Sequence, residues 1–105
     1  MTMPSRIVSN FEEQTGITGT GDEFIVNPTR EVTVVARLTA GTPATGARVQ
    51  ITLDDVEKIN AGTAVWVNSV LGNRTATGAE KIFRPVTGVR LSVTDGTWAF
   101  QVRQA

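Results

Sequence analysis

The sequence predicts an all-β fold, an antiparallel β-sandwich or small barrel of about six to eight short strands. Polar and apolar residues alternate in several segments, and turn-forming residues such as Asn27-Pro28 recur at intervals of roughly ten residues. Thr, which suits half-exposed strand faces, is abundant. We expect an N-terminal arm over residues 1–21 and one β-sandwich domain over residues 22–105.

Residues 1–21 are expected to form an arm because no helical or alternating period holds there for more than a few residues. The alternative is that residues 6–10 form an ordinary first strand of the sheet. The apolar side chains of the arm need a surface, on this domain or on a neighbouring molecule. We predict that they bind a partner: Ile7, Val8, Phe11 and Ile17.

The next predicted elements are a short strand and a first hairpin. Residues 24–26 form the strand, which ends before Pro28 because proline cannot donate to a ladder. Residues 31–38 and 47–53 then form the hairpin around an exposed, uncharged loop. Its inward face is predicted to join Leu38, Ala36, Val34 and Val32 with Ala47, Val49, Ile51 and Leu53.

The other face of this hairpin places Arg37 opposite Arg48. Like charges directly opposed across a ladder destabilise it, so either an acidic group lies between them or both side chains turn away into water. Asp55 or Glu57 of the same chain can serve. The alternative is an acidic group on another subunit, which would make both arginines partner-binding residues.

A single helical turn is predicted over residues 56–62, capped by Asp54 or Asp55 and stopped at Asn60 to Gly62. Residues 63–70 are the next predicted strand. Both of its faces are apolar, so it is a central strand or lies at a contact, and Trp66 is therefore a candidate partner-binding residue. A loop over residues 71–81 and a short strand over residues 82–84 follow.

The last predicted element is a second hairpin, residues 89–103. Asp95-Gly96 supplies the two positive-φ positions of a type I′ turn. Folding about this turn pairs Val93 with Trp98, Leu91 with Phe100 and Val89 with Val102. All of these bulky apolar side chains then lie on one face, which predicts a core on that side.

Composition narrows the function classes. The 105 residues carry ten basic and ten acidic side chains, so no charge excess favours nucleic acid or a membrane surface. The chain has no Cys, His or Tyr, which rules out Ser-His-Asp and Cys-His catalysis. We expect no enzyme activity, no cofactor, no metal and, because the first residues lack an apolar run, no signal peptide. Arginine outnumbers lysine eight to two, which is typical of protein interfaces or of G+C-rich genes.

Two clusters have alternative interpretations. Asp54, Asp55, Glu57 and Asn60 are dense in oxygen ligands, but their spacing does not match a calcium loop, and turn or capping roles explain them. Trp66 and Trp98 could form a sugar-stacking platform, although Trp98 falls on the inward hairpin face and is expected in the core.

The layout from about Phe24 to the C-terminus resembles small bacteriophage virion proteins, in particular capsid decoration, or cement, proteins with a β-sandwich core. The segments that carry the resemblance are the irregular N-terminal arm, EVTVVARL (31–38), VQITLDD (49–55), AVWV (64–67) and VTGVRLSVTDGT (86–97).

This resemblance implies a structural protein made in the host cytoplasm and added to the outer surface of the capsid. Such proteins commonly form trimers that bridge neighbouring major capsid subunits and stabilise the head. The alternatives are a phage tail or fibre module that binds a host surface glycan, and a head–tail or tail accessory protein.

Overall fold

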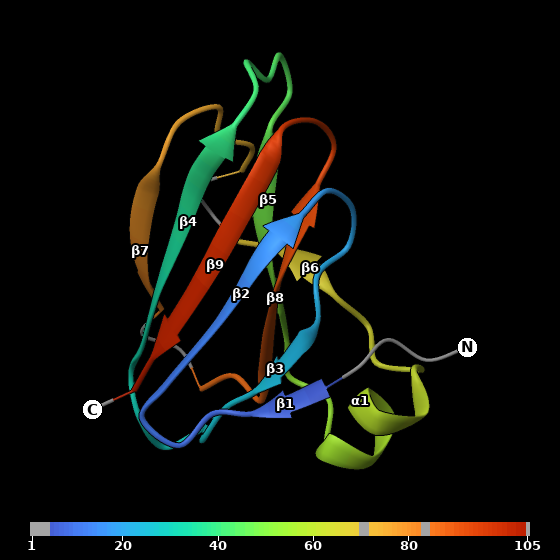
Figure 1. Cartoon of the computed structure of the whole chain (residues 1–105). Coiled ribbons are helices and arrows are strands. Elements are labelled where there is room, and N and C mark those ends of the chain that lie inside the picture. The colour runs from blue at the N-terminus through green and yellow to red at the C-terminus, as the bar shows by residue number, and fades with distance from the viewer. Residues whose placement is uncertain (1–4, 70–71, 83–84, 105) are drawn as a thin grey trace.

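The computed structural model describes residues 5–69, 72–82 and 85–104. Two sheets pack against each other, with a short helix at one end (Figure 1), so the predicted β-sandwich is confirmed. Sheet A has the strand order β1 (Ser5–Ile7), β3 (Glu23–Ile25), β8 (Gly88–Val93), β5 (Ala47–Thr52), β6 (Val67–Asn68). Sheet B has the order β2 (Phe11–Ile17), β9 (Thr97–Arg103), β4 (Val32–Ala40), β7 (Gly78–Ile82).

The core lies between the two sheets and uses the alternating residues that the sequence indicated. The rings of Phe24 and Phe100 meet edge to face, with their centroids 5.4 Å apart. Trp98 is fully buried, as predicted. The other fully or nearly fully buried apolar side chains of the core include Val32, Val34, Ala36, Ala47, Val49, Val89, Leu91 and Val102.

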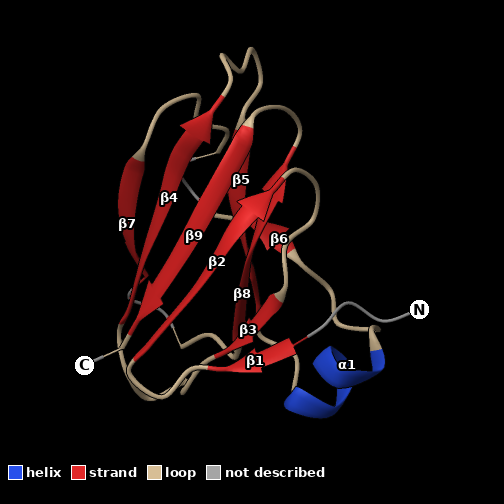
Figure 2. Ribbon diagram, in the orientation of Figure 1, coloured by secondary structure: helices blue, strands red, loops and turns tan. Residues whose placement is uncertain are grey.

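The pairing of the two predicted hairpins is wrong. β8 pairs with β3 and β5 in sheet A, whereas β9 pairs with β2 and β4 in sheet B. The connection from β4 to β5 crosses between the sheets in the same way, as Figure 2 shows. Two strands that face each other across a core share the inward alternation of a hairpin, so alternation alone does not distinguish the two arrangements.

The predicted Arg37–Arg48 opposition is wrong for the same reason. Arg37 lies opposite Ala99 in sheet B, and Arg48 lies opposite Ser92 in sheet A. No acidic group is therefore needed between the two arginines.

The Asp95-Gly96 link is not a type I′ turn, because only Gly96 has a positive φ, of 83°. Instead, the Asp95 carboxylate accepts hydrogen bonds from the backbone N–H groups of Ala44, at 2.8 Å, of Thr45, at 3.3 Å, and of Gly46. Bonds from Gly46 and Ala44 lower the pKa of Asp95 below its ordinary value. This aspartate thus ties the β4–β5 loop, which was predicted to be exposed, to the β8–β9 link.

The N-terminal residues do not form an extended arm. Residues 5–7 pair in parallel with β3, and residues 11–17 pair with β9. The alternative prediction, a first strand over residues 6–10, agrees better than the arm with the observed β1, which covers Ser5–Ile7. The alternation was hidden because β1 is short and the register of β2 shifts between Gln14 and Ile17, where Gly16 has a φ of 68°. Residues 1–4 lie outside the described residues.

Charged side chains turn inward at both edges of the sandwich. Arg6 lies opposite Phe24 on the core side of β1, donates to the backbone oxygen of Glu13 and pairs with Asp22, each at 2.8 Å. At the other edge, Glu80 of β7 lies opposite Val34 of β4 and accepts a hydrogen bond of 2.9 Å from Ser69. Inward charges of this kind discourage further strands from pairing with an open edge.

The region between β5 and β8 agrees in part with the sequence. Helix α1 (Val56–Ala61) is capped by Asp55 and ends at Gly62, whose φ is 76°, as predicted. The strand predicted over residues 63–70 is wrong in extent, because among its described residues β6 covers only Val67–Asn68. β6 lies at the edge of sheet A and is therefore not a central strand, and residues 70–71 lie outside the described residues. The predicted loop over residues 71–81 contains most of β7. Ile82 is in a strand as predicted, while residues 83–84 lie outside the described residues.

Candidate binding surface

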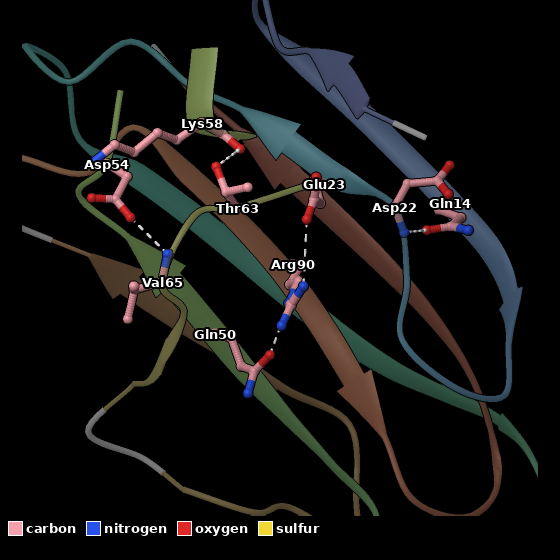
Figure 3. A network of polar contacts seen from close by, with 9 residues as sticks. All are labelled: Gln14, Asp22, Glu23, Gln50, Asp54, Lys58, Thr63, Val65 and Arg90. Carbon is pink, nitrogen blue, oxygen red and sulfur yellow. Dashed lines mark hydrogen bonds and ion pairs between the residues drawn. The ribbon is translucent and has the colours of Figure 1, made fainter. Parts of the chain in front are cut away.

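A row of polar side chains crosses the outer face of sheet A. Arg90 pairs with Glu23 at 3.4 Å, and its Nε donates to Gln50 at 2.8 Å. Gln50 in turn donates to Asn68 at 3.1 Å. Glu23, Arg90, Gln50 and Asn68 therefore link β3, β8, β5 and β6, and we call them the polar row. Figure 3 shows its first three members side by side.

The ion pair of the polar row is buried more than a surface pair. The Glu23 side chain is 4% exposed, and its Oε1 has no hydrogen-bond partner. Burial raises the pKa of Glu23 above its ordinary value, against the opposing effects of Arg90 and of the Trp66 side chain. Burial likewise lowers the pKa of Arg90, against the attraction of Glu23. Desolvation therefore outweighs attraction for both groups, and each depends on the other.

A small second core covers the sheet beside this row. Ile59 of helix α1 is fully buried although it lies on the outer face of sheet A. A Cβ at Gly88 would lie 3.0–3.1 Å from Thr52, Ile59 and Trp66, so these three side chains pack closely over the glycine. The Trp66 ring also stacks on Arg90, with the guanidinium carbon 4.4 Å from the ring centroid.

The segment that carries Trp66 is held against the end of β5. Thr63 donates to the Lys58 carbonyl through its backbone N–H, at 2.9 Å, and through its hydroxyl, at 3.5 Å. The Asp54 carboxylate accepts from the Val65 N–H at 2.6 Å; Figure 3 shows this bond and that of the Thr63 hydroxyl. Val67 lies opposite Ile51 in the ladder. Leu53 precedes Asp54, whose carboxylate binds Val65, so Leu53 and Val65 lie at the end of the β5–β6 pair that contains Val67.

Three exposed apolar side chains lie along the β5–β6 edge. Leu53 is 69% exposed, Val65 is 69% exposed and Val67 is 53% exposed. We call them the apolar strip. The acidic residues Asp54 and Asp55 border it, and both already bond to backbone N–H groups. Contiguous exposed apolar patches can mark protein interaction sites, which makes the apolar strip a candidate contact.

The structure separates the residues that the sequence suggested as partner-binding. Val8 and Ile17 pack in the core of their own domain. Ile7 and Phe11 are 75% and 40% exposed and lie on different sheets. Phe11 contacts the Arg103 guanidinium, whose carbon is 4.8 Å from the ring centroid.

The remaining predicted residues also lie apart. Arg37 is 3.6 Å from Glu13 on the outer face of sheet B, and Trp66 is half-buried on the opposite sheet. Arg48 lies on the outer face of sheet A without a charged partner among the described residues. Sequence reasoning missed Leu53, which it placed in the core. The adjacent Asp54-Asp55 pair was the available signal that the strand, and with it the core, ends there.

In the part of the chain that the structure describes, no group of three or more metal-ligating side chains could hold an ion, and no helix is long and apolar enough to cross a membrane. A scan against models of protein families found none that matches the chain. A search of curated proteins found no significant match.

Proposed function

We propose that this chain is a non-enzymatic structural protein of a bacteriophage virion that decorates the outer surface of the capsid and stabilises it by bridging major capsid subunits. The observation that carries the proposal is the apolar strip, which offers three exposed apolar side chains at the β5–β6 edge of the sandwich. Burying a Val or Leu side chain is worth about 1.5–3 kcal/mol. A weak contact repeated over a lattice is sufficient, because attachment at several points raises the effective concentration of each.

Several features support this role. The second core and the Asp54–Val65 hydrogen bond fix the strip without help from a ligand, so little ordering is needed on binding. The resemblance found in the sequence supplies the capsid as partner. It also suggests a closed homotrimer, whose mass analytical ultracentrifugation would measure.

The test compares a strip variant with a matched control in binding to empty mature shells of the phage that encodes the chain. Leu53→Gln combined with Val65→Gln removes apolar surface at two exposed positions. Ala79→Gln places the same side chain at an exposed position of β7 on the other sheet. We expect saturable co-sedimentation of the wild type and the control, and at least tenfold weaker binding of the double variant. Absence of saturable binding by the wild type, or equal binding by all three proteins, would refute the proposal.

A further inference from the structure

A second row of side chains lies beside the polar row on the outer face of sheet A. Arg48 of β5 is opposite Ser92 of β8, and Ser92 is opposite Thr20, which extends the sheet beyond β3. Arg48, Ser92 and Thr20 therefore share one face and form what we call the donor row. All three can donate hydrogen bonds.

The two rows differ in how their polar groups are satisfied. The members of the polar row bond to one another. By contrast, within the described residues the side chains of the donor row make no hydrogen bond or ion pair with the rest of the chain. The Nε of Arg48 is buried and has no acceptor. A buried donor without an acceptor destabilises a folded protein, and such groups are few in native structures.

The charged side chains on the outer face of sheet A also leave one positive charge unpaired. The registers of β3, β8 and β5 place three charged side chains on the outer face of sheet A: Glu23, Arg90 and Arg48. Glu23 and Arg90 neutralise each other. Arg48 remains as a positive charge opposite the uncharged Ser92.

We propose that the donor row binds a carboxylate side chain, an aspartate or glutamate, of the protein to which this chain attaches. A carboxylate accepts two parallel hydrogen bonds from a guanidinium, which suits the planar fork of arginine. As the carboxylate approaches, the Arg48 side chain swings outward, so that Nε and one terminal nitrogen donate to it. The hydroxyl of Ser92 donates from the neighbouring strand. The Nε–H of Arg48, which has no acceptor within the described residues, gains a charged acceptor in the complex.

The inference rests on the proposed function only for the identity of the partner, since the carboxylate chemistry follows from the donor row itself. An anionic sugar also carries a carboxylate. The lack of a charged partner for Arg48 among the described residues fits both sources, and the proposed function supplies a protein as the partner.

The first test uses the stability of the isolated protein. Arg48→Met keeps a long apolar stem over the sheet and removes the unmet donor. We expect it to raise the urea midpoint of unfolding and to weaken shell binding at least tenfold. Ser92→Ala is the matched variant, because it keeps the arginine and removes a second donor, and we expect it to weaken shell binding by about threefold. A lower urea midpoint for Arg48→Met would assign Arg48 a structural role and overturn the proposal.

The second test uses a defined probe and does not require shells. An acetylated peptide with two glutamates between glycines is titrated into the protein while the arginine Nε–H signals are followed by NMR. We expect the Arg48 signal to shift and saturate, and we expect no shift with the glutamine counterpart or in Arg48→Met. Equal shifts with both peptides would overturn carboxylate binding, and saturation with N-acetylneuraminate alone would overturn a protein partner. If neither the wild type nor any variant binds to shells, the proposed function fails, but the peptide titration still decides the role of Arg48.

Discussion

Replacing Gly88 with alanine tests whether the second core positions the apolar strip. The new Cβ would lie 3.0 Å from Thr52 Cγ2, 3.1 Å from Ile59 Cδ1 and 3.1 Å from Trp66 Cη2. Overfilling a packed site costs about 1–3 kcal/mol. The φ of Gly88 is not positive, so alanine also reduces the entropy of the unfolded chain and returns about 0.4–1 kcal/mol. Since three neighbours converge on the Cβ, we expect a net loss of about 1–2 kcal/mol.

Urea unfolding followed by tryptophan fluorescence measures this loss, and Trp66 reports its own displacement. The matched control is Gly19→Ala, because a Cβ at Gly19 would meet no atom within 4 Å and the φ of this residue is not positive. We expect the control to gain about 0.4–1 kcal/mol. Adding Ile59→Val to Gly88→Ala removes the Cδ1 atom and should relieve part of the strain. Equal gains for Gly88→Ala and the control would show that nothing packs on Gly88, and the reasoning would fail.

Three further predictions concern charged side chains. Arg90→Met leaves the buried Glu23 carboxylate without its cation and should cost about 3 kcal/mol in urea unfolding at neutral pH. The loss should shrink as the pH falls toward the raised pKa of Glu23, and Glu23→Gln in the same chain should restore most of the stability; no recovery would contradict this account. Asp95 has a lowered pKa, so its contribution is present above the ordinary aspartate pKa and is lost as the pH falls through the lowered one. Asp95→Asn should therefore be less stable at neutral pH and show a flatter acid limb, whereas an unchanged pH profile would argue against the loop contact. Arg6→Gln removes the hydrogen bond from β1 to the Glu13 carbonyl of β2 and the bond to Asp22, and it should speed hydrogen exchange in residues 11–17, with unchanged protection as the opposing result.

The sequence predicted which side chains point inward but not which strands pair. Leu91, Val93, Trp98 and Phe100 were placed correctly in the core, because alternation depends only on the local pleat. The partner of each strand depends on the direction in which the link leaves the sheet. At Asp95 that direction is set by hydrogen bonds to a loop some 50 residues earlier in the chain, which local sequence does not reveal.

The candidate surfaces were predicted only in part. Trp66 and Arg48 were selected from the sequence as partner-binding residues, but the stacking of Trp66 on Arg90 and the isolation of Arg48 depend on strand register. Leu53 continues the alternation of β5 beyond the point where sheet B covers it. Periodicity alone cannot locate that limit, because it is set by the extent of the opposite sheet.

The inward charges at the sandwich edges restrict how copies of this protein associate at high concentration. A strand from a second molecule that added to β2 would have to displace Arg6 from the Glu13 carbonyl, and one that added to β7 would lie beside the Glu80–Ser69 hydrogen bond. Fibril growth by strand addition is therefore disfavoured at β2 and β7, the two edges of sheet B. At these two edges, association between copies would therefore have to use side-chain contacts rather than added strands.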